Sequence, residues 1–155
     1  GGVITGIAGR KGLGRIHLEK DMMNQEVGFG LKVLQVIADM GISFEHLPSG
    51  IDTMCVVVAG EAFAPVKDKI INRIVATTNP DTITVHDHMS IIATVGRGMV
   101  HNCGTAARLF SAMSRARINV RMIDQGSSEL SIIVGVDDSD YAETIKAIYG
   151  AFVNQ

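Results

Sequence analysis

The sequence predicts an α+β protein of two βαββαβ modules, with the first module inserted into the second. The main observation is a repeat at about 76 residues, the separation of Gly28 from Gly104. Segments that begin at Ile16 and at Ile91 share the order of apolar strand, glycine-bearing loop, amphipathic helix and two apolar strands. A copy of this length is large enough to form a small module with its own packed layers.

Composition limits the classes of protein that fit. The chain has 155 residues, of which 46% are hydrophobic and 19% are charged, close to an ordinary globular domain. A net charge of −2 gives no basic surface for nucleic acid or for an anionic membrane. No run approaches the roughly 18 apolar residues of a membrane span, and no secretory signal opens the chain. We therefore predict a cytoplasmic protein that binds neither nucleic acid nor membrane.

Cysteine and histidine positions indicate no metal site. Cys55 falls in an apolar segment and Cys103 at the junction of a loop and a helix, without metal-ligand spacing. His86 and His88 would share one face of a strand, but no third ligand is close in sequence. We expect reduced thiols, no bound metal and a polar connector at the two histidines. Because the chain starts at Gly1 without an initiator methionine, we also expect it to be part of a longer protein.

Periodicity and turn residues predict the elements of the first copy. Ile16 and Leu18 alternate with polar residues, as in a half-buried strand. A helical pattern ends at Gly41, where a left-handed C-cap is expected, and Pro65 suits the first turn of a second helix. A turn at 48–50 separates two apolar strands. The expected strands are 15–20, 42–47, 53–59 and 83–85, and the expected helices are 27–38 and 65–78.

The second copy repeats this order but stops one strand short. Asp140 and Glu143 have the spacing of a capping box at the start of its last helix. The apolar segment 3–8 has no place in the first copy, so we predict that it completes the sheet of the second. The other expected strands of this copy are 91–95, 118–123 and 129–136, and its first helix is 104–117. The first module then covers residues 14–87, and the second covers 3–9 together with 88–155.

Two stretches carry a family resemblance that extends over almost the whole chain. The second copy reads GRGMVHNCGTAARLFSAMSRARINVRMIDQGSSELSIIVGV from Gly96, and the first reads MMNQEVGFGLKVLQVIADMGISFEHLPSG from Met22. Both resemble the paired regulatory ACT modules of aspartate kinases, with the string QGSSE at 125–129 among the most specific parts. The opening VITGIAGRKG resembles the strand that joins the catalytic domain to this pair. The resemblance implies ferredoxin-like ACT modules that bind an end-product amino acid and pair as a homodimer.

Nothing in the chain resembles the catalytic part of an aspartate kinase. The run GRKGLGR at 9–15 lacks the spacing of a Walker-type phosphate loop, and no helix follows it. We interpret this run as a mobile basic connector. We therefore expect no catalytic residues and no cofactor here. The resemblance places ATP and Mg in a catalytic kinase domain elsewhere in the full-length protein.

The loop before the first helix has the chemistry of a carboxylate site. Gly28 and Gly30 flank Phe29 where a helix N-terminus offers unpaired N–H groups. Glycines that serve only strand-to-helix packing are the alternative. The resemblance implies an effector site between this loop and the following strand of a neighbouring module. Its implied residues are Met23, Gln25, Glu26, Gly28, Phe29 and Gly30 on one wall, and Ser43, Phe44, Glu45, Asp52 and Thr53 on the other.

The acidic residues decide which amino acid the site would take. Glu45 and Asp52 can pair with the ε-ammonium of lysine in a partly desolvated cleft, which favours lysine. Either acid can instead be a solvated residue at a strand edge. Glu26 stands where lysine-inhibited relatives carry a small hydroxyl residue, and its charge would repel an effector carboxylate. Threonine, or lysine and threonine together, therefore stays open.

The matching loop of the second copy is a second candidate site. The amide of Gln125 can hydrogen-bond the hydroxyl of threonine, as a glutamine does in resembling threonine-sensitive kinases. The residues of this candidate site are Met99, Asn102, Gly104, Thr105, Asn119 and Gln125. Two other interpretations remain: a free-standing ACT protein that binds amino acids, and a purely structural dimerisation module. In a homodimer, we expect the sheets of the first modules to continue side by side, with effector sites at the seam.

Overall fold

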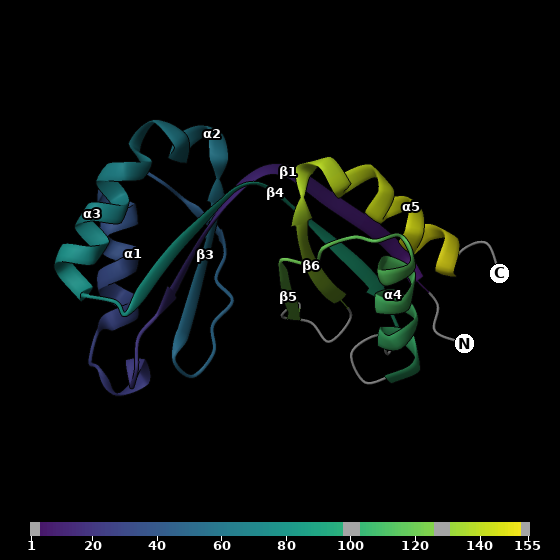
Figure 1. Cartoon of the computed structure of the whole chain (residues 1–155), viewed down its shortest axis with the longest axis horizontal. Helices are drawn as coiled ribbons and strands as arrows, with labels where there is room; N and C mark the ends of the chain where they lie inside the picture. Colours follow the sequence, from purple (N-terminus) through teal and green to yellow (C-terminus); the bar gives the residue numbers. More distant parts are fainter. Residues whose placement is uncertain (1–3, 98–102, 126–130, 153–155) are drawn as a thin grey trace. The chain divides into compact units, whose positions relative to one another are not determined.

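The computed structural model describes residues 4–97, 103–125 and 131–152, and the chain divides into two compact units (Figure 1). We call residues 12–88 the inserted unit, and residues 1–11 with 89–155 the outer unit. The predicted fold class is confirmed: the protein is α+β, with two βαββαβ modules and the first inserted into the second. The expected first module, residues 14–87, lies within the inserted unit, and the residue bounds of both modules stay a prediction.

The two long strands β1 and β4 contribute to both units. The inserted unit contains the second part of β1 (Ile4–Glu19), then α1 (Phe29–Asp39), β2 (Phe44–His46), β3 (Thr53–Ala59), α2 (Gly60–Phe63), α3 (Lys67–Thr78) and the first part of β4 (Thr82–Gly96). The outer unit contains the rest of β4, then α4 (Cys103–Arg115), β5 (Met122–Gln125), β6 (Ser131–Asp137), α5 (Tyr141–Phe152) and the first part of β1. Short 3-10 helices cover Met23–Gln25, Ala64–Val66 and Asp138–Asp140. No helix in the described part of the chain is long and apolar enough to cross a membrane.

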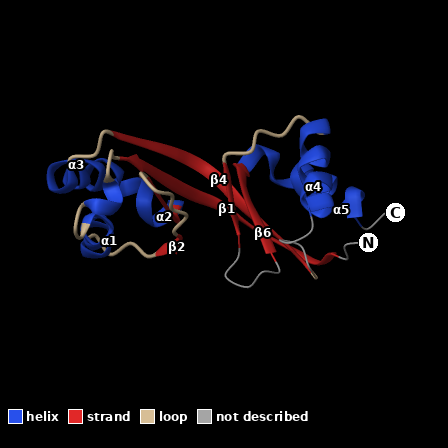
Figure 2. Cartoon of the chain, turned by 90° about the horizontal axis from the view of Figure 1, so that it is seen from below, coloured by secondary structure: helices blue, strands red, loops and turns tan. Residues whose placement is uncertain are grey.

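Alternation along β1 determines which side chains enter the core of the inserted unit, whose strand order is β2-β3-β1-β4. In the antiparallel register, Ile16 lies opposite Val56 and Leu18 opposite Met54. All four side chains are buried on one face of the sheet. Helices α1 and α3 lie side by side and cover this face (Figures 1 and 2). Their buried side chains in this core are Phe29, Val33, Val36, Ile37, Ile70 and Ile74.

The outer unit has the strand order β1-β4-β6-β5 and a core of its own. Ile92 of β4 lies opposite Val134 of β6, and both are fully buried. Helices α4 and α5 contribute Leu109, Met113 and Ile148 to this core. On the other side of β4, the Thr5 hydroxyl of β1 donates a hydrogen bond to the Val95 carbonyl at 3.3 Å. The N-terminal strand therefore lies next to β4 in this unit.

Two segments that the sequence indicates as connectors are strands in the structure. The whole basic run 9–15 belongs to β1, and both His86 and His88 belong to β4, although both segments do lie where the chain passes from one unit to the other. The prediction of a mobile connector is wrong because pairing with a neighbouring strand satisfies the backbone groups of a segment whose own composition favours a loop. The expected strand 118–123 also begins later, at Met122. Arg117 has a left-handed φ of 58°, which turns the chain after α4.

Candidate functional site

The inserted unit contains a pocket of about 410 Å³ between the start of α1 and the segment that enters β3. One wall comes from the loop before α1 and from its first turns, and the other comes from residues 47–54. The lining residues are Met23, Glu26, Gly28, Phe29, Gly30, Leu31, Leu34, Leu47, Ser49, Gly50, Ile51, Thr53 and Met54. The lining is mostly apolar and contains a few polar groups, as small-molecule sites usually do.

Six of the expected effector residues line this pocket, namely Met23, Glu26, Gly28, Phe29, Gly30 and Thr53. The other five do not line it. Four of them are exposed, namely Gln25, Ser43, Phe44 and Glu45. Asp52 is half-buried and stands in the sequence between the lining residues Ile51 and Thr53. Residues 43–45 do not line the pocket, and the pairing of β2 with β3 shifts register between Phe44 and His46. The assignment of these residues to effector binding stays a prediction.

The backbone at the start of α1 presents hydrogen-bond donors to the pocket. Gly28 is the N-cap of α1 and has a φ of 79°, which strongly favours glycine. The Phe29 amide donates a long 3.4 Å hydrogen bond to the Glu26 carbonyl. The amides of Gly30 and Leu31 follow in the first turn, where a helix has no intrahelical acceptor for its N–H groups. Two adjacent donors at the positive end of α1 can bind a carboxylate.

Lys20 compensates the negative charge of Glu26, which from the sequence alone is expected to repel a carboxylate ligand. Its ammonium lies 2.5 Å from Glu26 Oε2 and donates a 2.7 Å hydrogen bond to the Thr78 carbonyl. It also lies 5.4 Å from the centre of the Phe29 ring. The two charged side chains are 20% and 33% exposed, so their attraction is screened less than on an open surface. The repulsion expected between Glu26 and an effector carboxylate is therefore offset by Lys20, a residue outside the expected site.

Seven lining residues are absent from the expected site, namely Leu31, Leu34, Leu47, Ser49, Gly50, Ile51 and Met54. The helical spacing of Leu31 and Leu34 predicts that they share one face of a helix. It does not predict that this face borders a pocket. Leu31 and Ile51 are 70% and 75% exposed despite being large and apolar. Exposed apolar side chains gathered at one place mark an interaction surface.

The second candidate site is only partly described. Met99 and Asn102 lie outside the described residues, whereas Gly104 and Thr105 begin α4. Asn119 and Gln125 are exposed. Gln125 pairs with Ile132 of β6. Among the residues that the structure describes, no group of three or more histidine, cysteine or acidic side chains is arranged to hold a metal ion.

Comparisons with known proteins agree with this architecture. A family model described as an ACT domain matches residues 92–152. Aspartokinase 3 of Bacillus subtilis (strain 168) is 39% identical over 152 residues, which are 97% of this chain and 34% of that protein. The crystal structure of Clostridium acetobutylicum aspartate kinase is 45% identical, with a TM-score of 0.89, over 99% of this chain and 35% of that one.

A third similarity covers a whole chain of similar size. The regulatory subunit of aspartate kinase from Thermus flavus matches with a TM-score of 0.80, over 96% of this chain and 98% of that subunit. At 21% identity, this match concerns the fold alone. The present chain spans about a third of the length of the Bacillus subtilis relative.

Two glycines of the pocket should respond differently to the same added methyl group. Gly28→Ala should lower the free energy of unfolding by roughly 1–2 kcal/mol because φ is left-handed there. Gly30→Ala should change it by less than about 1 kcal/mol, since the nearest atom to a new Cβ is 3.9 Å away and alanine favours a helix. Urea unfolding of both variants measures the difference. Equal losses would contradict the backbone role assigned to Gly28.

Proposed function

Because the chain belongs to the regulatory ACT regions of aspartokinases, we propose that it binds an end-product amino acid and thereby controls an aspartate kinase. The observation that carries this proposal is the pocket at the start of α1. Its volume of about 410 Å³ falls within the roughly 300–1,000 Å³ of small-molecule sites. The amides of Gly30 and Leu31 would hold the carboxylate of the amino acid.

We propose lysine as the effector. Asp52 is half-buried beside the pocket, and Glu26 inside it is already paired with Lys20. Asp52 is therefore the better partner for the ε-ammonium, with Glu45 as the alternative from the sequence. Lysine forms a complex with aspartokinase III of Escherichia coli, which shares this fold at 17% identity. That similarity concerns the fold alone, so the choice of effector depends on the charges named here.

The kinase activity belongs to the parent protein in this proposal. The curated relatives are aspartokinases much longer than this chain. A catalytic domain in the full-length chain would bind ATP and Mg and phosphorylate aspartate in the cytoplasm. The present region would supply feedback control without catalytic residues of its own.

Threonine is the second candidate effector. Gln125 is exposed at the end of β5, where its amide can reach a ligand hydroxyl. Parts of the loop that would complete this site lie outside the described residues. Binding measurements with both amino acids therefore distinguish lysine from threonine.

Lysine should stabilise the folded chain, whereas methionine should not. At about 100 times its dissociation constant, a ligand that binds only the folded state raises the free energy of unfolding by roughly 2.7 kcal/mol. Calorimetric titration gives the dissociation constant, and thermal unfolding with lysine, threonine or methionine gives the stabilisation. Stabilisation by threonine alone, abolished by Gln125→Ala, would show that the second loop is the working site.

Asp52→Asn should weaken lysine binding by roughly 1.5–3 kcal/mol, the value of a hydrogen bond to a charged group. The change keeps the shape of the side chain and leaves the Asp52 carbonyl available to the Lys20 amide, which donates to it at 3.1 Å. Glu45→Gln is the matched control, because Glu45 is exposed and does not line the pocket. A loss of affinity in the control but not in Asp52→Asn would reverse the roles of the two acids.

We also propose that a second copy of the chain covers the pocket mouth. Val27, Leu31 and Ile51 are 93%, 70% and 75% exposed. Strand β2 lies at the edge of the sheet in this unit, and Phe44 on it is 49% exposed. An open strand edge beside apolar side chains favours pairing between copies.

Val27→Glu should therefore shift the mass measured by light scattering from two 16.5 kDa chains towards one. Val75→Glu, at a 41% exposed position on α3, is the control and should keep the dimer. A wild-type mass of one chain at all concentrations, with and without lysine, would contradict the dimer.

A further inference from the structure

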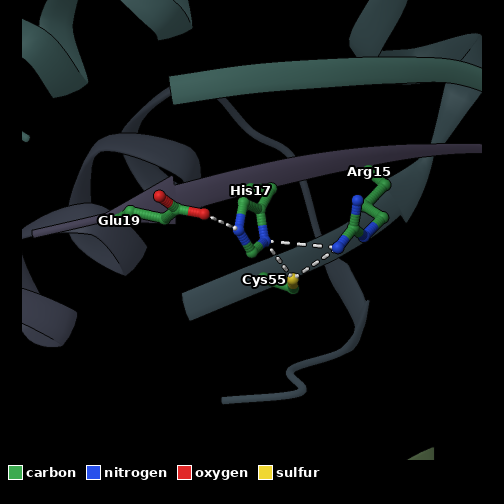
Figure 3. Close-up of polar contacts among 4 residues, drawn as sticks. All are labelled: Arg15, His17, Glu19 and Cys55. Atoms are coloured by element: carbon green, nitrogen blue, oxygen red, sulfur yellow. Dashed lines mark hydrogen bonds and ion pairs between the residues drawn. The ribbon is translucent and has the colours of Figure 1, made fainter. Parts of the chain in front are cut away.

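Four polar side chains of the inserted unit, Arg15, His17, Glu19 and Cys55, form a cluster (Figure 3). Since Ile16 and Leu18 point into the core, alternation places Arg15, His17 and Glu19 on the other face. Cys55 of β3 lies directly opposite His17 in the antiparallel register. The cluster therefore combines a thiol with a potential proton acceptor and a cation.

The distances in this cluster form a continuous chain from sulfur to carboxylate. His17 Nδ1 lies 2.9 Å from Cys55 Sγ, and His17 Nε2 lies 3.1 Å from Glu19 Oε1. This geometry fits a thiol that donates to Nδ1 and an imidazole that donates through Nε2 to Glu19. Transfer of the thiol proton to Nδ1 would give a thiolate and an imidazolium, and Glu19 would stabilise the imidazolium.

Arg15 supports the thiolate in this charge distribution, whereas its positive charge beside Nδ1 opposes the imidazolium, which Glu19 stabilises from the other side of the ring. Its Nη2 lies 3.3 Å from Cys55 Sγ and 3.2 Å from His17 Nδ1. A guanidinium and an imidazole next to a thiol favour the thiolate, which is the nucleophilic form. Glu19 is 52% exposed and the His17 side chain 21% exposed, while Cys55 is 7% exposed. The cluster therefore connects a mostly buried sulfur to the solvent through polar side chains.

A further observation indicates what could bind next to the sulfur. Arg15 Nε is buried and has no hydrogen-bond partner within the described residues. A buried donor without an acceptor is costly, and native proteins rarely leave one so. An oxygen atom attached to Cys55 Sγ would lie close to the same guanidinium and could accept from Nε. The cluster thus has an unused donor for an oxidised form of the cysteine.

We propose that Cys55 is an oxidation site, at which a small hydroperoxide converts the thiol to a sulfenic acid held by Arg15. The thiolate attacks one peroxide oxygen, so that an S–O bond forms and the O–O bond breaks. His17 Nδ1 passes the original thiol proton to the departing oxygen, which leaves as water or an alcohol. Sulfur loses two electrons and the peroxide gains them. This activity is separate from effector binding and does not depend on it.

The size of the expected effect follows from thiol chemistry. A free thiol titrates near pH 8.5, so only about 1% is thiolate at about pH 6.5. Groups that favour the thiolate increase this reactive fraction by up to about two orders of magnitude at such a pH, and the lower nucleophilicity of a more acidic thiol removes up to about tenfold of the gain. Cys55 in the folded chain should therefore oxidise at least about fivefold faster than in the unfolded chain.

The test uses the 155-residue chain with Cys103→Ser, so that Cys55 is its single thiol. Folded protein and protein in concentrated guanidinium are treated with hydrogen peroxide for timed intervals, and catalase ends the reaction. Remaining thiols are alkylated after unfolding, a sulfenic-acid trap is added with the denaturant, and mass spectrometry counts the modified sulfur. Oxidation of the folded chain at or below the rate of the unfolded chain would overturn the proposal, because Cys55 would then be a protected structural thiol.

Substitutions in the cluster test whether Cys55 oxidises quickly because its neighbours activate the thiol or only because peroxide can reach it. His17→Gln should bring the folded rate down to the unfolded rate or below it, and Arg15→Gln should lower it several-fold. Arg73→Gln is the matched control, because Arg73 is an exposed arginine on α3 outside the cluster. In the unfolded state, all variants should react at one rate. An unchanged folded rate in His17→Gln, with the fold verified by circular dichroism, would also overturn the proposal.

Discussion

The pairing of β1 with β3 is the constraint on which the inserted unit depends. Its antiparallel register places Ile16 and Leu18 against the partners that complete the core. A shift by one residue would turn these apolar side chains away from α1 and α3 and bring His17 into the core. Strand β3 begins next to the pocket, because its first residues Thr53 and Met54 line it. Core, pocket wall and thiol cluster are thus consequences of one strand alignment.

Lys20 connects the end of β1 to the pocket. Its ammonium interacts with the Thr78 carbonyl at the end of α3, with the Glu26 carboxylate and with the Phe29 ring. These partners belong to different parts of the unit, so one cation holds together the end of β1, the end of α3 and the loop that leads into α1. This pairing compensates the charge of the Glu26 carboxylate inside the pocket. A partly buried carboxylate without such a partner would be costly and would disfavour an anionic ligand.

Local patterns were sufficient for much of the fold and for one wall of the pocket. The alternation at Ile16 and Leu18 predicts β1, and the glycines around Phe29 predict the donors at the start of α1, because both features depend on neighbouring residues. The opposite wall depends on how residues 47–54 return to α1, which is decided by strand pairing and by the register shift in β2. The contact between Lys20 and Glu26 is likewise a product of tertiary structure. Neither has a signal in the local sequence.

Strand β3 carries two chemistries on adjacent residues. Met54 lines the pocket and packs in the core, whereas Cys55 points to the opposite face and contacts His17. The Cys55 amide donates a 2.8 Å hydrogen bond to the Pro48 carbonyl, next to the pocket residues Ser49 and Gly50. A backbone shift at Cys55 would therefore move this wall of the pocket. This shared backbone makes communication between the two sites physically possible, but coupling requires that oxidation and effector binding favour different arrangements of β3.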